Sequence, residues 1–399
     1  PSCVPATSFE TAGDVLGIEE VDELLQRDDI YYLSEMMNYP GVLFQDDEVM
    51  AKIALAAKYG KQVDGHAPGL RGEKAKQYAA AGITTDHECF TIEEALDKLE
   101  YGMKILIREG SAARNFDALI PLLKDYADRC MFCCDDKHPD ELLSGHINEH
   151  VKKAVSLGYD TMNVIRCATL NPVKHYNMNV GLLQESDPAD FIVVNNLTDF
   201  KIIQTVIDGV VLSSDGKCIL PSKKHPIINN FHTSKKQASD FEIAESGKEI
   251  KVIEAIDGQL ITRTFVTGAT TKNGKLVSDE KNDIIKLAVV NRYADSPPAV
   301  AFIKNTGIRN GAFASSVAHD SHNIIVAGTS DELIARAVNL IIENKGGLSV
   351  ITEDEAFALP LPVAGILSDQ DAVTIGTGYQ KADALVKKLG SKLRAPYMT

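Results

Sequence analysis

The chain has 399 residues and a formal net charge of −15, from 41 basic and 56 acidic side chains. Hydrophobic residues make up 44% and charged residues 24% of it, as in ordinary globular domains, and the length predicts two or three domains. The acidic balance argues against nucleic acids and anionic membranes as partners, because both need basic patches. No apolar run reaches the roughly 18 residues of a membrane-spanning helix.

Short apolar runs alternate with amphipathic stretches over the first part of the chain. The apolar runs predict strands over 31–37, 61–67, 82–87, 104–110 and 129–135. The amphipathic stretches predict helices over 46–60, 72–82, 91–102, 139–158 and about 160–177. Such alternation is typical of a parallel sheet covered by helices. We therefore expect an α/β fold over residues 1–180, of the (β/α)8 TIM-barrel type.

The pattern changes after Gly181. Residues 181–225 alternate apolar and polar side chains around turn residues, which predicts short antiparallel strands. The polar segment 226–249 is predicted to connect two domains. Residues 250–399 hold several strand runs and two helical stretches, at 331–347 and 383–393, and predict an α+β domain.

Four potential metal ligands stand where apolar runs stop: Glu35, His66, His87 and Asp135. The carboxyl ends of all strands of a (β/α)8 barrel meet on one face, so these side chains are expected to converge there. Imidazole and carboxylate groups together make a mixed nitrogen–oxygen site, which suits a metal that activates water. Ordinary alternatives are loop histidines, a helix-face glutamate and a surface turn at Asp135–Asp136.

Long motifs resemble the adenine deaminase family of the amidohydrolase superfamily over the whole chain. They include LSEMMNYPGV, VDGHAPGL, GITTDHE, MFCCDDKHPDELLSGHINEHV, SSVAHDSHNIIVAGT and LPLPVAGILSD. The resemblance implies that residues 1–180 are an incomplete (β/α)8 barrel with about six of its eight strands. It also implies that residues 181–225 belong to a small β-sandwich and that residues 250–399 are the family's C-terminal domain. It also implies hydrolysis of adenine to hypoxanthine and ammonia.

The same resemblance implies roles for the residues at the strand ends. Two divalent metals are expected, Mn²⁺ with Fe²⁺ as the alternative, held by Glu35, His66, His87 and Asp135. Glu35 matches the position at which other two-metal amidohydrolases carry a carboxylated lysine. Asp135 is expected to be both ligand and proton shuttle, with Asp136 as second candidate. Glu88 is the candidate for proton transfer at a ring nitrogen.

Substrate contacts are predicted for Arg71, Asp136, His319 and His322. The two histidines belong to HDSHN (319–323), which joins two apolar strands. This segment is either a tight polar turn or a cover over the mouth of the site. Arg108 and Glu109, at another strand end, are further candidates for shaping the pocket.

One feature departs from the superfamily pattern. The His-x-His pair that supplies two metal ligands at the first barrel strand does not occur in these 399 residues. The chain begins at Pro1, inside a segment that resembles barrel strand 3. We interpret it as an internal fragment or part of a longer chain and expect little or no activity from these residues alone. The alternatives are another cyclic amide or amidine hydrolase and an inactive folded module.

The cysteines bear on the cellular compartment. Seven of them, most within or beside apolar segments, favour buried reduced thiols and a cytoplasmic protein. Cys130 and Cys133 have the spacing of a redox or zinc pair, but their place inside an apolar strand favours core packing. We expect a homo-oligomer that binds a small-molecule substrate.

Overall fold

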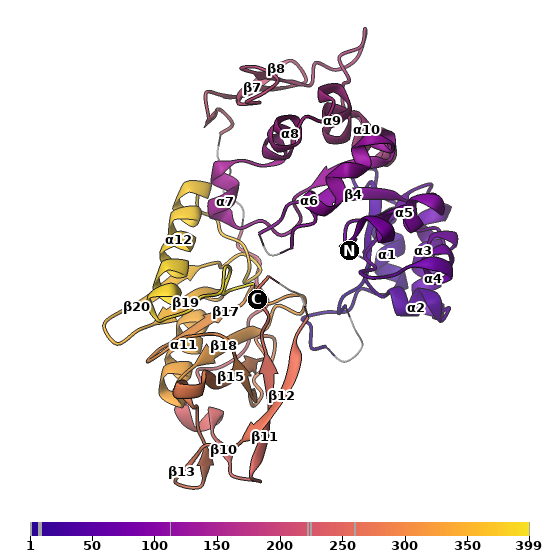
Figure 1. Ribbon diagram of the computed structural model, residues 1–399. Coiled ribbons are helices and arrows are strands. Elements are labelled where there is room, and N and C mark those ends of the chain that lie inside the picture. The colour runs from indigo at the N-terminus through magenta and orange to yellow at the C-terminus, as the bar shows by residue number, and fades with distance from the viewer. Residues whose placement is uncertain are drawn as a thin grey trace.

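The computed structural model describes residues 2–6, 10–111, 113–221, 223, 226–258 and 261–398. It has two lobes (Figure 1): an α/β lobe drawn from indigo to magenta, and a C-terminal lobe drawn from orange to yellow. A small antiparallel sheet lies between them in the sequence. In the described ranges, no helix combines the length and apolar character needed to cross a membrane.

Five parallel strands form the frame of the α/β lobe: β1 (Tyr32–Met36), β2 (Gln62–Gly65), β3 (Thr85–Asp86), β4 (Lys104–Arg108) and β5 (Cys130–Cys133). β1 pairs with β2, and β3, β4 and β5 pair in that order. The amide of Thr84 donates to the carbonyl of Val63 at 2.8 Å and joins β2 to β3. The parallel arrangement is the predicted one. At the start of the chain a further strand was expected, but the described residues 2–6 and 10–17 form none.

Most of the connecting helices lie outside these strands, whereas α7 (Pro139–Ser144) lies beside the C-terminal lobe (Figure 1). The connecting helices are α1 (Ile18–Leu25), α2 (Tyr39–Leu43), α3 (Asp47–Lys58), α4 (Gly72–Ala80), α5 (Ile92–Glu100), α6 (Phe116–Leu119), α7, α8 (Ile147–Ser156), α9 (Thr161–Ala168) and α10 (Leu170–Tyr176), with 3₁₀ helices at Ile120–Lys124 and Ala127–Arg129. The single helix expected over 139–158 is two helices, because α7 ends at Ser144, just before Gly145, and glycine is a poor helix former.

Two apolar cores hold the strands to the helices. One joins Leu33 of β1 and Val63 of β2 to Ile53 of α3. The other lies around Ile105 of β4 and Cys130 of β5. All seven cysteines are free thiols, and Cys130 packs in the core as predicted.

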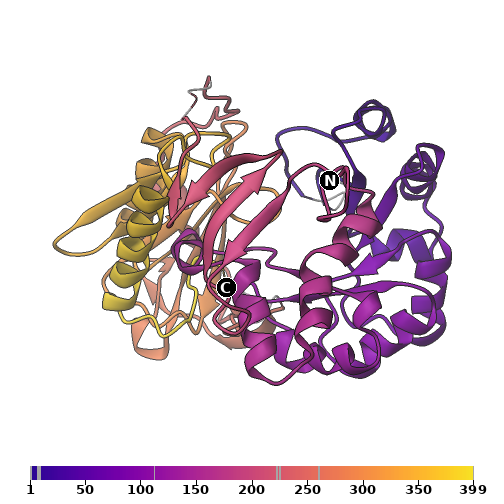
Figure 2. The ribbon, with the colours of Figure 1, turned by 90° about the horizontal axis from the view of Figure 1, so that it is seen from above.

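Residues 191–218 form antiparallel strands, as the sequence predicts. They are β6 (Phe191–Val194), β7 (Ile202–Ile207), β8 (Val210–Ser214) and β9 (Lys217–Cys218), paired in that order. Within the described part of the segment they make one sheet rather than the two layers of a sandwich. Seen from above, this sheet lies over the boundary between the two lobes (Figure 2).

The C-terminal lobe is built on an eight-stranded sheet with the order β12-β11-β16-β15-β18-β17-β19-β20, antiparallel except at β11–β16. Its strands are β11 (Glu249–Glu254), β12 (Arg263–Gly268), β15 (Ile284–Val290), β16 (Ala299–Lys304), β17 (Ala312–Ser315), β18 (Ile324–Gly328), β19 (Gly347–Ile351) and β20 (Ala356–Pro360). A smaller sheet holds β10 (Ile243–Ala244), β13 (Thr271–Lys272) and β14 (Lys275–Leu276). The helices are α11 (Asp331–Glu343), α12 (Ala372–Lys388) and 3₁₀ turns at Ala238–Phe241 and Glu280–Asn282.

The two long helices cover opposite faces of the large sheet. Side chains alternate between the faces of a strand. On β17, Ala312 and Ala314 pack in the core that contains α11, whereas Phe313 packs in the core that contains α12. The lobe is therefore a three-layer structure with its sheet in the middle.

The segment 226–249 is not the free connection that its polarity predicts. Phe231 and Phe241 are buried in the α11 core. The amide of His232 donates to the carbonyl of Arg292 at 2.7 Å, and the Asn229 amide group donates to the carbonyl of Pro362 at 2.8 Å. Two aromatic side chains thus tie this stretch into the C-terminal lobe.

Candidate metal centre and active site

The predicted ligands come together at the carboxyl ends of the parallel strands. Glu35 lies on β1, His66 directly follows β2, His87 directly follows β3, and Asp135 lies two residues after β5. Because parallel strands all end on the same edge, residues 31 to 52 positions apart in the chain become neighbours. This convergence is the geometry expected from the sequence.

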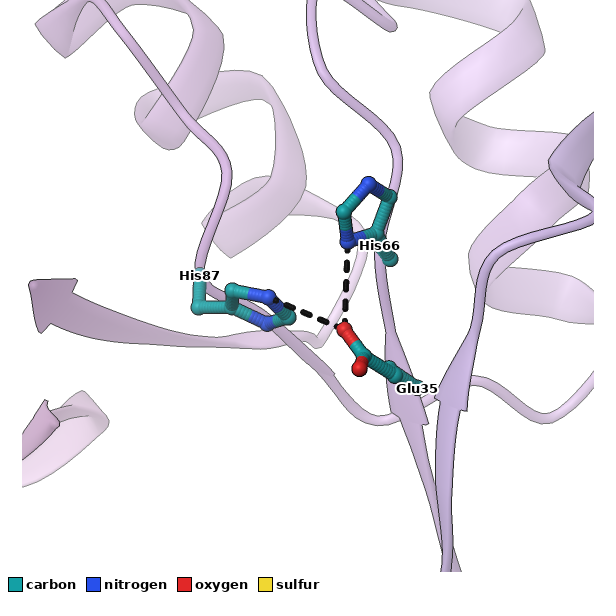
Figure 3. A group of neighbouring side chains, drawn as sticks. All are labelled: Glu35, His66 and His87. Atoms are coloured by element: carbon teal, nitrogen blue, oxygen red, sulfur yellow. Dashed lines mark hydrogen bonds and ion pairs between the residues drawn. The ribbon is translucent and has the colours of Figure 1, made fainter. Parts of the chain in front are cut away.

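Glu35 stands at the centre of the first ligand group. Its Oε2 lies 3.2 Å from His66 Nδ1 and 3.3 Å from His87 Nε2, so both imidazoles point at one carboxylate oxygen (Figure 3). The three ligand atoms lie within 4.8 Å of one another. Such spacing allows one cation to contact all three residues.

His87 also belongs to a second group. Its Nε2 lies 3.4 Å from Glu88 Oε1 and 3.5 Å from Asp135 Oδ2. Arg108, at the end of β4, donates through Nη1 to the carboxylates of both Glu88 and Asp135. The two groups share His87 and form one continuous cluster of imidazoles and carboxylates.

The electrostatics of the cluster favour an added positive charge. Hydrogen bonds from His66 and His87 hold the pKa of Glu35 well below its ordinary value. Burial lowers the pKa of His87, but the Glu35 hydrogen bond and the charges of Asp135 and Glu88 outweigh it and raise that pKa to about 9. The carboxylates therefore draw a proton onto this imidazole, and a divalent cation would supply the same charge with the imidazole neutral.

A buried carboxylate oxygen without a hydrogen-bond partner in the described part of the chain also favours a bound cation. Glu88 is 2% exposed, and its Oε2 has no hydrogen-bond partner among the described residues. A buried carboxylate oxygen without a partner costs free energy unless a donor or a cation meets it. The donor set of Glu35, His66, His87, Glu88 and Asp135 fits a hard or borderline divalent metal.

Close packing of two strands brings the histidines together. A Cβ on Gly65, the last residue of β2, would lie 2.2 Å from the carbonyl oxygen of Thr85. Tyr78, fully buried on α4, donates to the carbonyl of Met36 at 2.8 Å and accepts from the amide of His66 at 3.1 Å. Gly65 thus sets the approach of β2 to β3, and Tyr78 joins the end of β1 to His66.

Asn115 links the ends of β3 and β4. Its Oδ1 accepts from the amide of Arg108 at 2.6 Å, and its Nδ2 donates to the carbonyls of His87 at 3.0 Å and Cys89 at 3.1 Å. Local sequence patterns did not identify Asn115 or Tyr78, and they indicated only a general role for Arg108. Arg108 ends the apolar run KILIR, which is the same pattern that identified His66.

A cavity of about 260 Å³ opens onto the cluster. The α/β lobe lines it with Glu35, His66, Glu88, Arg108, Asp135 and Asp136, and the C-terminal lobe with His319, Asp320 and Met398. His319 Nε2 lies 3.6 Å from Asp136 Oδ1. The HDSHN segment therefore reaches the mouth of the site, which was one of its two interpretations. The cavity is near the lower limit of about 300 Å³ for ligand pockets and suits a small ligand.

Two groups on the His319 side of the cavity also have shifted pKa values. The hydrogen bond to Asp320 raises the pKa of His319, and burial raises the pKa of Asp136. The pair can present both a donor and an acceptor to a polar ligand.

Two predicted substrate contacts lie elsewhere. Arg71 is exposed and pairs with Asp97 at 3.0 Å, because it precedes α4 on the outer surface rather than facing the strand ends. The ring of His322 packs edge-on against His319, with 5.5 Å between centroids, and does not line the cavity. Neither Arg71 nor His322 lines this cavity, so the structure does not bring these two predicted substrate contacts to it.

Comparisons with known proteins agree with this geometry. The amidohydrolase family model matches residues 1–212. The chain belongs to the amidohydrolase family. A model described as the adenine deaminase C-terminal domain matches residues 259–399. The family implies a divalent metal, and the cluster at the strand ends supplies candidate ligands for one.

Curated relatives of this amidohydrolase bear the name adenine deaminase. They include proteins from Methanosarcina mazei (49% identical over 412 residues), Sulfurovum sp. (50% over 398) and Salinibacter ruber (49% over 401). Each alignment covers 100% of this chain and 73–74% of the relative. The chain thus spans about three quarters of the length of these relatives.

Proposed function

We propose that this chain carries the site for hydrolytic deamination of adenine to hypoxanthine and ammonia. The relatives at 49–50% identity are named for this activity, and the C-terminal half matches a domain named for it. The observation that carries the proposal is the convergence of Glu35, His66 and His87 within 4.8 Å of one another, beside Glu88 and Asp135. Another cyclic amide hydrolase is the less favoured function, because residues 259–399 match a model described as the adenine deaminase C-terminal domain.

The proposed metals are two Mn²⁺ ions, with Fe²⁺ as the alternative. Glu35, His66, His87 and Asp135 would hold them, since mixed imidazole and carboxylate sets suit both ions. Bound there, they would lower the pKa of water and make it a nucleophile at neutral pH.

The carboxylates divide the proton transfers. Asp135 is partly exposed to the cavity and takes the proton from the attacking water. Glu88, buried at the base of the cavity, carries a proton to the ring nitrogen beside the reacting carbon. Arg108 donates to both carboxylates and so holds them together on one side of the substrate. A proton passed on to the exocyclic amine lets it leave as ammonia.

The C-terminal lobe completes the purine pocket from the other side. His319 and Asp136 face each other across 3.6 Å and line the cavity. Their paired donor and acceptor match the alternating nitrogen acceptors and N–H donors on the edge of a purine ring. We assign them to substrate binding rather than to the proton transfers.

The test is the rate of hypoxanthine and ammonia formation from adenine. Because the relatives are longer than this chain, turnover is measured on the complete gene product, and metal binding on residues 1–399. We expect Mn²⁺-dependent deamination that a chelator abolishes, and loss of both turnover and Mn²⁺ binding in Glu35→Gln. Ring opening of a cyclic amide without adenine turnover would overturn the proposal.

A further inference from the structure

A buried cluster of three charged residues lies directly behind the metal-ligand loops. Lys98 and Glu94 are one turn apart on α5, and Asp86 is the last residue of β3. Their side chains are 0%, 3% and 0% exposed, respectively. Lys98 Nζ lies 3.0 Å from Asp86 Oδ2 and 2.9 Å from Glu94 Oε1. None of the three side chains lines the cavity, so the cluster has no direct part in the chemistry proposed above.

The cluster binds the backbone of the loop that carries His66. Lys98 Nζ donates to the carbonyl of Ala67 at 2.8 Å, and the amide of Ala67 donates to Asp86 Oδ2 at 3.1 Å. The amide of Gly69 donates to Glu94 Oε1 at 2.8 Å. Both backbone polar groups of the residue after His66 are therefore held by this one charge cluster.

The same cluster binds the segment that carries His87 and Glu88. Asp86 Oδ1 accepts from the amide of Glu88 at 2.6 Å, and Glu94 Oε2 accepts from the amide of Phe90 at 3.1 Å. Lys98 also lies 3.6 Å from the sulfur of Cys89. Two loops that lie about 20 residues apart in the chain are thus fixed to one ammonium group and its two carboxylates.

We propose that Lys98 is a positioning residue for the metal centre, because it fixes the spacing between His66 and the His87–Glu88 pair through Asp86 and Glu94. Buried ion pairs often add little net stability, so a cluster with this connectivity is better explained by the geometry it specifies. Groups that orient metal ligands from behind typically change metal affinity or activity by about 10–100-fold when they are removed. The expected change in kcat rests on the proposed function, whereas the expected change in Mn²⁺ affinity rests on the ligand geometry alone.

The chain offers a matched control. Lys286 is also a buried lysine, 2% exposed, and donates to Asp331 at 2.6 Å and to the carbonyl of Phe241 at 3.0 Å. It lies on β15 in the C-terminal lobe, outside the cavity. Lys98→Met and Lys286→Met therefore make the same chemical change at equal burial, one behind the metal ligands and one away from them.

The experiment measures the Mn²⁺ dissociation constant, thermal unfolding, and kcat and KM for adenine in both variants. We expect both to unfold at lower temperature, but only Lys98→Met to bind Mn²⁺ at least about tenfold more weakly and to lose kcat with a smaller change in KM. Unchanged Mn²⁺ affinity and kcat in a folded Lys98→Met protein would overturn the proposal, as would an equal loss of affinity in Lys286→Met.

A second variant tests the proposal if Lys98→Met does not fold. Lys98→Met with Glu94→Gln restores the net charge of the cluster while removing its central donor. If this double variant folds, weakened Mn²⁺ binding supports the positioning role, and wild-type binding overturns it. Metal binding can be measured without the substrate, so the two proposals can fail separately. If the wild-type enzyme does not deaminate adenine, the proposed function is refuted. If Lys98→Met still weakens Mn²⁺ binding in that enzyme, the positioning role is supported.

Discussion

Replacing Asp135 by Asn tests the assignment of the proton acceptor. Asp135 has a positive φ of 51°, and Asn is one of the few residues that adopts this left-handed conformation readily, so the backbone should not move. The side chain keeps its shape and one oxygen but loses the charge that Arg108 and His87 contact. Loss of a general base typically costs on the order of 10²–10⁴ in rate, which is roughly 3–5 kcal/mol in activation free energy. We expect kcat to fall by that factor and KM to change far less.

The assay follows conversion of adenine to hypoxanthine, with metal content measured on the same samples. Asp136→Asn is the matched control, because it removes the same charge one residue further on, where the contact is with His319 instead of Arg108. It should raise KM and leave kcat within a few-fold. A fully metal-loaded Asp135→Asn enzyme with near-normal kcat would refute the assignment and move the role to Glu88 or Asp136.

Three further predictions follow from individual contacts. Gly65→Ala places a methyl group 2.2 Å from the Thr85 carbonyl oxygen, so it should lower the free energy of unfolding by about 1–3 kcal/mol and weaken Mn²⁺ binding. Chemical unfolding and metal titration would measure the two effects. A variant with unchanged stability and Mn²⁺ affinity would contradict the close approach of β2 to β3. Burial lowers the pKa of His150 to about 4 from 6.5, so on acidification the unfolded chain binds a proton before the folded protein does. The free energy of unfolding should keep its full value above pH 6.5 and fall by up to about 3 kcal/mol toward pH 4. His150→Gln should show a smaller loss over the same pH range. His319→Gln should raise KM for adenine several-fold with kcat nearly unchanged, whereas a loss confined to kcat would assign His319 to the chemistry instead of to binding.

The convergence of the ligands could be predicted because it follows from a general property of parallel sheets. Apolar runs locate the strands, and the polar residue after each run must then lie on the common carboxyl edge. This pattern predicts that His66, His87 and Asp135 lie together, and it applies equally to Arg108 at the end of KILIR, whereas Glu35 lies on β1 itself and was assigned through the family resemblance.

The supporting contacts could not be predicted in this way. Asn115 bonds to residues 26 to 28 positions earlier, and Lys98 bonds to Ala67, 31 positions earlier. Hydrophobic periodicity identifies which face of an element is buried, but not the partner that a buried polar group will meet. The same limit explains Phe231 and Phe241, two aromatic residues whose polar neighbours predict an exposed connection although both pack in a core.

Contacts between the two lobes cannot be predicted from local sequence patterns either. Arg71 was placed at the site because it follows the His66 strand in sequence, yet it lies on the outer surface beside Asp97. His319 comes from the other lobe, about 180 residues after Asp136, and still lines the cavity. Only the packing of the two lobes brings it there.

The most direct test of the metal centre is anomalous diffraction at the manganese edge from crystals of the protein equilibrated with Mn²⁺. The geometry predicts an anomalous peak within coordination distance of Glu35 Oε2, His66 Nδ1 and His87 Nε2, because the two nitrogens already lie 3.2 and 3.3 Å from that carboxylate oxygen. No peak at this position at saturating Mn²⁺, or a peak only at a distant surface carboxylate, would contradict the account.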